Sequence, residues 1–268
     1  MKYKTSSGQK VLFLLLFAAF LVAFFFLSIK KAAEEPAETP GKIVTTTPVV
    51  VKPTEPKVEP VITEPTKATT TPEKVYLTGV PFMVQAPFGE WKDPRQQDAC
   101  EEMTTLLAVS WAQGISAITK TEAKEKILAM VKFEEENFGE SRDTSAADTI
   151  ERLYFGLFNY QKVRLEENIT SEDIIQKLRN GNLVVVPANG QLLKNIHFTQ
   201  PGPERHMIII RGFDFLKKEF ITNDVGIGVG ENYSYPEDVL FSAIADYPSG
   251  YHVPRVGMPK VMIVVEKE

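Results

Sequence analysis

The stretch RQQDACEEMTTLLAVSWAQG, residues 95–114, predicts a helix that begins just before the only cysteine of the chain. Asp98 is expected to be the N-cap, and Glu101, three residues further on, to complete a capping box. Gly114 follows the apolar pattern and is expected to stop the helix. Cys100 would then be the second helical residue, where free backbone N–H groups and the positive end of the helix dipole favour an anion.

This position makes Cys100 a candidate nucleophile, because a helix start lowers the pKa of a thiol. Met103, Leu107 and Trp111 continue from it at spacings of three and four, so the sulfur lies at the open end of a buried face. The alternative is that Cys100 only fills the core, since free cysteine is among the most buried residue types. A thiol nucleophile also needs a base and a group that orients the base.

Three histidines are available as the base. His197 and His252 lie in the loop-like stretches NIHFTQPGPE and SGYHVPR and are expected to be exposed. His206 opens the apolar strand HMIIIRGFD, so its ring can face a cleft while the next residues anchor the strand. If this strand forms a hairpin with EFITND, Asp224 or Asn223 lies beside His206 and can orient its ring. The alternative is that Asn-Asp before a glycine-rich stretch forms only a turn.

Residues 75–268 alternate between helical and strand-like patterns and predict one α+β domain. Further helices are expected at residues 120–138, 144–160 and 171–182. Strands are expected in VPFMV (80–84), LVVVPA (183–188), HMIIIRGF (206–213), EFITND (219–224) and KVMIVVEKE (260–268). Because most helices come first and most strands afterwards, we expect a helical layer, with the cysteine helix in it, packed on a mostly antiparallel sheet.

The amino-terminal part has a different composition. Residues 1–10 carry three lysines, and residues 11–29, VLFLLLFAAFLVAFFFLSI, are uncharged and close to the about 20 residues that span a bilayer. The run exceeds the roughly 7–15 apolar residues of a cleavable signal peptide, so it predicts a transmembrane signal anchor; cleavage near KKAAEE is the alternative. The preceding lysines predict a cytoplasmic amino terminus and an extracytoplasmic, membrane-tethered domain, or a secreted one after cleavage.

Residues 30–74 are rich in Pro, Thr, Val, Glu and Lys, lack aromatic residues and predict a disordered linker. The net charge of −5 argues against nucleic acid as the main partner. A single cysteine cannot form a disulfide within the chain. The histidines have no ligand spacing and no second thiol accompanies them, so neither a metal nor a cofactor is expected.

The segments VPFMVQAPFGEWKDPRQQDACEEMTTLLA, RHMIIIRGFD and FITNDVGIGVGENYSY, in this order, resemble the bacterial cysteine peptidases that process bacteriocin leaders, the peptidase C39-like family, in its stand-alone branch. The resemblance extends over residues 80–247 and implies a papain-like fold that cleaves peptide bonds. It implies Cys100 as the nucleophile, His206 as the base and Asp224 as the group that orients His206.

The resemblance also implies an oxyanion hole, in which Gln85 and the backbone N–H of Cys100 are the donors. Gln96 and Gln97 are nearer to the cysteine in sequence and remain alternatives for Gln85. The chain departs from the family pattern at Glu101, where glycine is common, and at Val225, where proline is frequent. The two carboxylates next to the thiol, Glu101 and Glu102, oppose formation of the thiolate unless Glu101 is occupied in capping.

The sequence thus predicts a thiol peptidase or amidase that acts through an acyl-enzyme on a peptide or protein near the outer membrane face, with the bilayer as second partner. Transfer of the acyl group to an amine, which is transpeptidation, remains open, as does the substrate. The alternative is a surface-displayed peptide-binding or scaffold module that keeps the fold and does not use the thiol.

Overall fold

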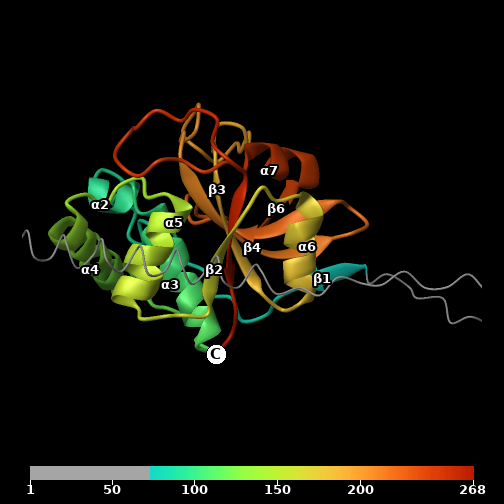
Figure 1. The fold of residues 1–268 in the computed structure, drawn as a ribbon, viewed down its shortest axis with the longest axis horizontal. Coiled ribbons are helices and arrows are strands. Elements are labelled where there is room, and N and C mark those ends of the chain that lie inside the picture. Colours follow the sequence, from blue (N-terminus) through green and yellow to red (C-terminus); the bar gives the residue numbers. More distant parts are fainter. Residues whose placement is uncertain (1–72) are drawn as a thin grey trace, which may run out of the picture. The chain divides into compact units, whose positions relative to one another are not determined.

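The computed structural model describes residues 73–268 of the chain (Figure 1). The predicted cytoplasmic tail, the anchor at residues 11–29 and nearly all of the linker lie outside the described residues. Within residues 73–268, no helix combines the length and apolarity needed to cross a membrane.

A seven-stranded antiparallel sheet forms the centre of the domain, as predicted for the α+β fold. Its hydrogen-bonded order is β2 (Val163–Glu167), β7 (Val261–Val265), β3 (Leu183–Ala188), β4 (His206–Asp214), β5 (Glu219–Asn223) and β6 (Glu231–Pro236), and β1 (Lys74–Tyr76) pairs with β4 beside a bulge at residues 210–212. The predicted strands at 183–188, 206–213, 219–224 and 260–268 are confirmed. Strands β1, β2 and β6 were not predicted, because they are short or exposed.

Helices cover both faces of the sheet (Figure 1). One layer contains α2 (Pro94–Gln97), α3 (Cys100–Ala112), α4 (Lys120–Phe138), α5 (Ala146–Thr149) and the π-helix η1 (Ile150–Leu157). The other face carries α6 (Ser171–Arg179), and α7 (Glu237–Ala243) packs on β5 and β6. Because both faces are covered, β3 and β7 are buried along their whole length and read as continuous apolar runs.

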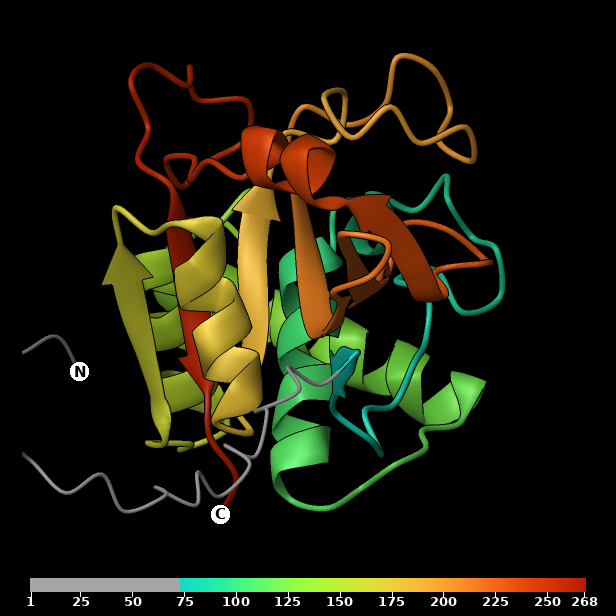
Figure 2. The same cartoon turned by 90° about the vertical axis from the view of Figure 1, so that its right-hand side faces the viewer.

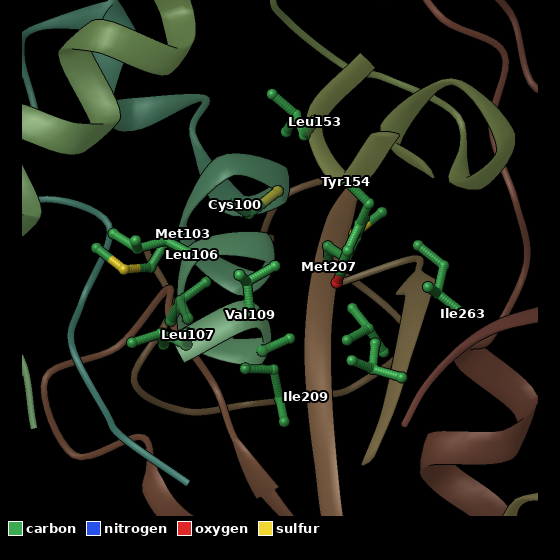
Figure 3. Packing of buried hydrophobic residues seen from close by; sticks show 14 of the residues in the cluster. Cys100, Met103, Leu106, Leu107, Val109, Leu153, Tyr154, Met207, Ile209 and Ile263 are labelled. Carbon is green, nitrogen blue, oxygen red and sulfur yellow. The ribbon is translucent and has the colours of Figure 1, made fainter. Parts of the chain in front are cut away.

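Alternate residues of the central strands enter two separate hydrophobic cores, as the two-residue period of a strand requires. Met207, Ile209 and Ile263 pack against the apolar face of α3 and against Leu153 and Tyr154 of η1 (Figure 3). The other core lies under α6 and contains the intervening residues Ile208, Ile210 and Val264. The predicted stripe of α3 is buried, with Cys100 at its amino-terminal end (Figure 3).

The start of α3 differs from the prediction. Asp93 caps the separate helix α2 by accepting the Arg95 N–H, and Pro94 takes its first position. Asp98 is therefore the C-cap of α2, and its own N–H donates to the Pro94 carbonyl over 3.1 Å. The N-cap of α3 is Ala99, which offers no side-chain oxygen, so Cys100 is the first residue of α3 and Glu101 does not cap it.

Two other predicted elements differ from those in the structure. Residues 80–84 form no strand. Side chains occupy the carbonyls of the first two residues: the Val80 carbonyl accepts from Arg211 over 3.3 Å and the Pro81 carbonyl accepts from Asn223 over 2.9 Å. The helix predicted at 144–160 is split into α5 and η1. At the end of η1 the Phe158 N–H donates to the carbonyl of Leu153, five residues earlier, which is the hydrogen-bond pattern of a π-helix.

Candidate active site

Cys100 and His206 line one cavity of about 580 Å³, at the end of the sheet where β4 begins. The loops at residues 189–205 and 244–260 gather beyond this end of the sheet (Figure 2). The cavity is also lined by residues from the loop before α2, from the segment after α4 and from the glycine-rich loop after β5. They include Gln85, Trp91, Asp143 and Gly226. Chain segments far apart in sequence thus meet around one thiol.

The predicted hairpin between β4 and β5 forms and places His206 beside Asp224. The His206 Nε2 lies 2.7 Å from the Asp224 Oδ1, and both side chains are buried. Asn223, the alternative to Asp224, instead donates to the Pro81 carbonyl. Because Nε2 is occupied, Nδ1 is the ring nitrogen that remains for a thiol.

Asp224 is held on both carboxylate oxygens. Its Oδ1 also accepts the Gly226 N–H over 3.0 Å, and its Oδ2 accepts the Tyr235 hydroxyl over 2.6 Å. Burial alone would raise the pKa of Asp224, but the adjacent His206 and these hydrogen bonds hold the pKa below its usual value. Asp224 is therefore an ionised group fixed against the imidazole.

The His206 ring is also confined by its apolar neighbours. Phe198 meets it edge to face, with 5.4 Å between the ring centroids. A Cβ on Gly226 would lie 2.9 Å from the His206 Cε1, closer than nonbonded carbons approach. The absence of a side chain at Gly226 thus allows the loop after β5 to pack against the ring.

Of the three candidate glutamines, Gln85 and Gln97 line the cavity that contains Cys100. The Gln85 backbone N–H donates to the Val225 carbonyl over 3.0 Å, and its Nε2 donates to the Gln97 carbonyl over 2.5 Å. An amide nitrogen has two hydrogens, so a second donor of Gln85 remains. Gln96 is buried and directs its amide to Glu90 and Asp93 instead.

The thiol itself is engaged by Glu101, a contact that the capping prediction missed. The Cys100 Sγ donates to the Glu101 Oε2 over 3.0 Å, and the Tyr247 hydroxyl donates to the Glu101 Oε1 over 2.6 Å. Burial, followed by the neighbouring Glu101 charge, raises the pKa of the Cys100 thiol well above its usual value. The prediction that the helix start lowers the pKa of the Cys100 thiol is therefore wrong for this arrangement.

Tyr235 and Tyr247 are the residues of this site that sequence reasoning did not single out. Tyr235 lies eleven residues after Asp224, inside a segment that carries the family resemblance, but nothing in its spacing marks it. Tyr247 lies 146 residues after Glu101, so no local pattern connects them. His197 and His252 are exposed, as predicted. Residues 73–268 contain no group of three or more His, Cys, Asp or Glu side chains arranged to hold a metal ion.

Comparison with known proteins identifies one family. A model of the Peptidase C39 like family matches residues 77–246. A crystal structure of a Bacillus anthracis protein, described as a candidate C39-like peptidase, matches with a TM-score of 0.47 and 17% identity over 73% of this chain and 98% of that chain. No curated protein matches the chain.

Proposed function

The chain belongs to the Peptidase C39-like family, and on this premise we propose that it is a cysteine peptidase with Cys100, His206 and Asp224 as its catalytic groups. One observation carries the proposal: His206, whose Nε2 lies 2.7 Å from Asp224, lines the same cavity as the single thiol of the chain. A base that is oriented by an ionised carboxylate and shares a cavity with a thiol is the arrangement that nucleophilic catalysis needs.

In the proposed reaction, the His206 Nδ1 takes the thiol proton while Asp224 stabilises the imidazolium at Nε2. The Cys100 sulfur then bonds to the substrate carbonyl carbon, and the carbonyl oxygen becomes an oxyanion. Collapse of this intermediate breaks the C–N bond, and His206 gives its proton to the leaving amine. Water, activated by the same imidazole, then hydrolyses the thioester and frees Cys100.

Two donors are available for the oxyanion. The Cys100 backbone N–H belongs to the first turn of α3, where N–H groups have no partner within the helix. The second is the free amide hydrogen of Gln85, whose side chain is anchored to the Gln97 carbonyl near the start of the same helix. Two donors at a developing oxyanion are the arrangement that stabilises acyl transfer.

The test uses the full chain with casein as an unstructured substrate and mass spectrometry of the products. We expect cleavage by the parent, none by Cys100→Ser, and a loss of roughly 10²-fold or more in His206→Ala. The matched control is His197→Ala, a histidine that is exposed at the same cavity and is not held by Asp224. Equal cleavage by the parent and by His206→Ala would exclude His206 as the base.

A second candidate function is a peptide-binding module that keeps the cleft without turnover. It is favoured by one observation, the hydrogen bond of the Cys100 thiol to Glu101 with a raised thiol pKa. This candidate requires that Cys100→Ser binds peptides as tightly as the parent and that the parent releases no product over many hours. Product release by the parent that disappears in Cys100→Ser would exclude it.

We also propose that residues 11–29 anchor the protein in a membrane, with residues 75–268 on the outer side. The support is the uncharged run of the sequence and the lysines that precede it. The full chain should remain in the membrane fraction after a carbonate wash at high pH, and external protease should remove the domain from intact cells. Recovery of the full chain in the soluble fraction would contradict this topology.

A further inference from the structure

We propose that Glu101 is a positioning residue that holds the Cys100 thiol in a protonated resting state, in competition with His206. This inference deepens the proposed function, since it concerns the regulation of the same thiol. It starts from the direction of the one hydrogen bond that the thiol donates among residues 73–268, which leads to Glu101.

The contact is a fixed one. The Cys100 Sγ lies 3.0 Å from the Glu101 Oε2, and the Tyr247 hydroxyl lies 2.6 Å from the Glu101 Oε1. Glu101 is 1% exposed and Tyr247 is fully buried, so water does not compete for the carboxylate. Each carboxylate oxygen thus has its own donor, and the side chain cannot rotate away from the thiol without leaving the tyrosine hydroxyl unpaired in the core.

The charges around Glu101 do not neutralise it. Glu102 follows it on α3, Glu134 faces it from α4, and Asp143 acts on it from the segment between α4 and α5. Among residues 73–268, none of the ion pairs includes Glu101; Arg152 pairs with Glu134 and Asp148 instead.

On the remaining side of Glu101, Tyr247 supplies a neutral hydroxyl. The guanidinium of Arg255 lies 5.6 Å from the tyrosine ring rather than against the Glu101 carboxylate. His206 shares the cavity with Cys100 and is paired with Asp224. Burial raises the pKa of Glu101 to about 7, against the opposing hydrogen bonds from Cys100 and Tyr247. Above that pH an anion therefore lies beside the sulfur, and a second anion on the sulfur is disfavoured.

The consequence for the site is a competition over one proton. While Glu101 is ionised and accepts the thiol hydrogen, Cys100 keeps its proton and is a poor nucleophile. Transfer of that proton to His206 requires the S–H to leave Glu101 and turn toward the imidazole. Removal of the Glu101 charge should therefore release the thiol, whereas a purely structural role for Glu101 would leave the pH dependence of the thiol unchanged.

The test follows alkylation of Cys100 in the full chain by iodoacetamide between about pH 5 and about pH 10, a reaction in which the thiolate sulfur displaces iodide. Glu101→Gln keeps the shape and the hydrogen-bond acceptor and removes the charge. We expect its alkylation midpoint to fall by about one pH unit or more, which is about tenfold in rate at pH 7. The matched control is Glu102→Gln, on the same helix and also 1% exposed, which lacks the bond to sulfur and should shift the midpoint less.

An unchanged or higher midpoint in Glu101→Gln overturns the proposal. So does a lower alkylation rate at every pH, which would make Glu101 the group that accepts the thiol proton. If Glu101→Gln fails to fold by near-ultraviolet circular dichroism, Tyr247→Phe takes its place: loss of the hydroxyl disfavours the charged carboxylate, so the midpoint should again fall, and no change overturns the proposal.

Repeating the measurement in His206→Ala separates this inference from the proposed function. The shift caused by Glu101→Gln should persist without the imidazole, because the repulsion acts directly between Glu101 and the sulfur. The experiment can therefore exclude a catalytic role for His206 while the effect of Glu101 remains. It can also exclude the effect of Glu101 while His206 remains essential for cleavage.

Discussion

Replacing Glu134 by glutamine is expected to make the free energy of unfolding less sensitive to pH between about pH 5 and about pH 8. Glu134 lies on α4 and is fully buried against the start of α3, near Glu102, which is 1% exposed. Arg152 approaches Glu134 only to 3.8 Å, and the side chain of Glu102 is the hydrogen-bonding group next to it. Burial, followed by the Glu101 charge, raises the pKa of Glu134 to about 8.

The sign follows from proton uptake. In the unfolded chain Glu134 releases its proton near pH 4.5, the ordinary value for a glutamate side chain, whereas in the folded state it keeps the proton up to about pH 8. The contribution of Glu134 to the free energy of unfolding is therefore fully present below the pKa that it has in the unfolded chain. It is lost as the pH rises through the pKa that it has in the folded protein. Between about pH 5 and about pH 8 the loss is on the order of 3 kcal/mol, since each unit of pKa difference corresponds to about 1.4 kcal/mol.

The assay is urea unfolding of the full chain at several pH values, followed by the fluorescence of its tryptophans. Over this pH interval the unfolding free energy of the parent should fall more than that of Glu134→Gln, by about 3 kcal/mol. Glu101, whose pKa is raised by burial to about 7, leaves part of the slope in both proteins. The control is Glu136→Gln on the same helix, whose side chain is 65% exposed and whose replacement should leave the slope unchanged. Equal slopes in the parent and in Glu134→Gln would refute the reasoning.

Three further predictions concern the imidazole and its supports, each measured as casein cleavage by the full chain. Gly226→Ala should lower kcat by at least about tenfold, because its Cβ would meet the His206 Cε1 at 2.9 Å, whereas Gly228→Ala, with no atom within 4 Å, should match the parent. Tyr235→Phe removes a hydroxyl that donates to Asp224 and should lower kcat by roughly 10-fold to 100-fold with little change in KM; an altered KM alone would contradict this role. Asp224→Asn should cost roughly 10²-fold or more, and activity close to the parent would exclude it as the orienting group.

The local elements of the domain were predictable because their signals are short-range. The apolar stripe of α3 and the continuous apolar runs of β3, β4 and β7 require only spacing and composition, and each lies where it was predicted. The hairpin between β4 and β5 joins consecutive strands, so the approach of His206 to Asp224, 18 residues apart, follows from the turn between them.

The boundaries of α3 were less predictable, because two helix starts compete within a few residues. Asp93 and Pro94 together begin α2, and this helix uses Asp98 at its end rather than leaving it free to cap α3. Both aspartates fit a capping pattern in the sequence. The choice between them depends on how the short helix packs, which local spacing does not record.

The amino-acid sequence by itself determined the α+β class, the position of the single thiol at a helix start and the order of the residues that carry the family resemblance. Only the tertiary structure decided what surrounds that thiol. Glu101 looked like a capping residue, yet its carboxylate lies between Cys100 and Tyr247, and Tyr247 is 146 residues away from Glu101 in the sequence. The physical reason is that spacing encodes which face of a helix or strand is apolar, whereas the ionisation of a buried group depends on every charge and dipole that the folded chain brings to it.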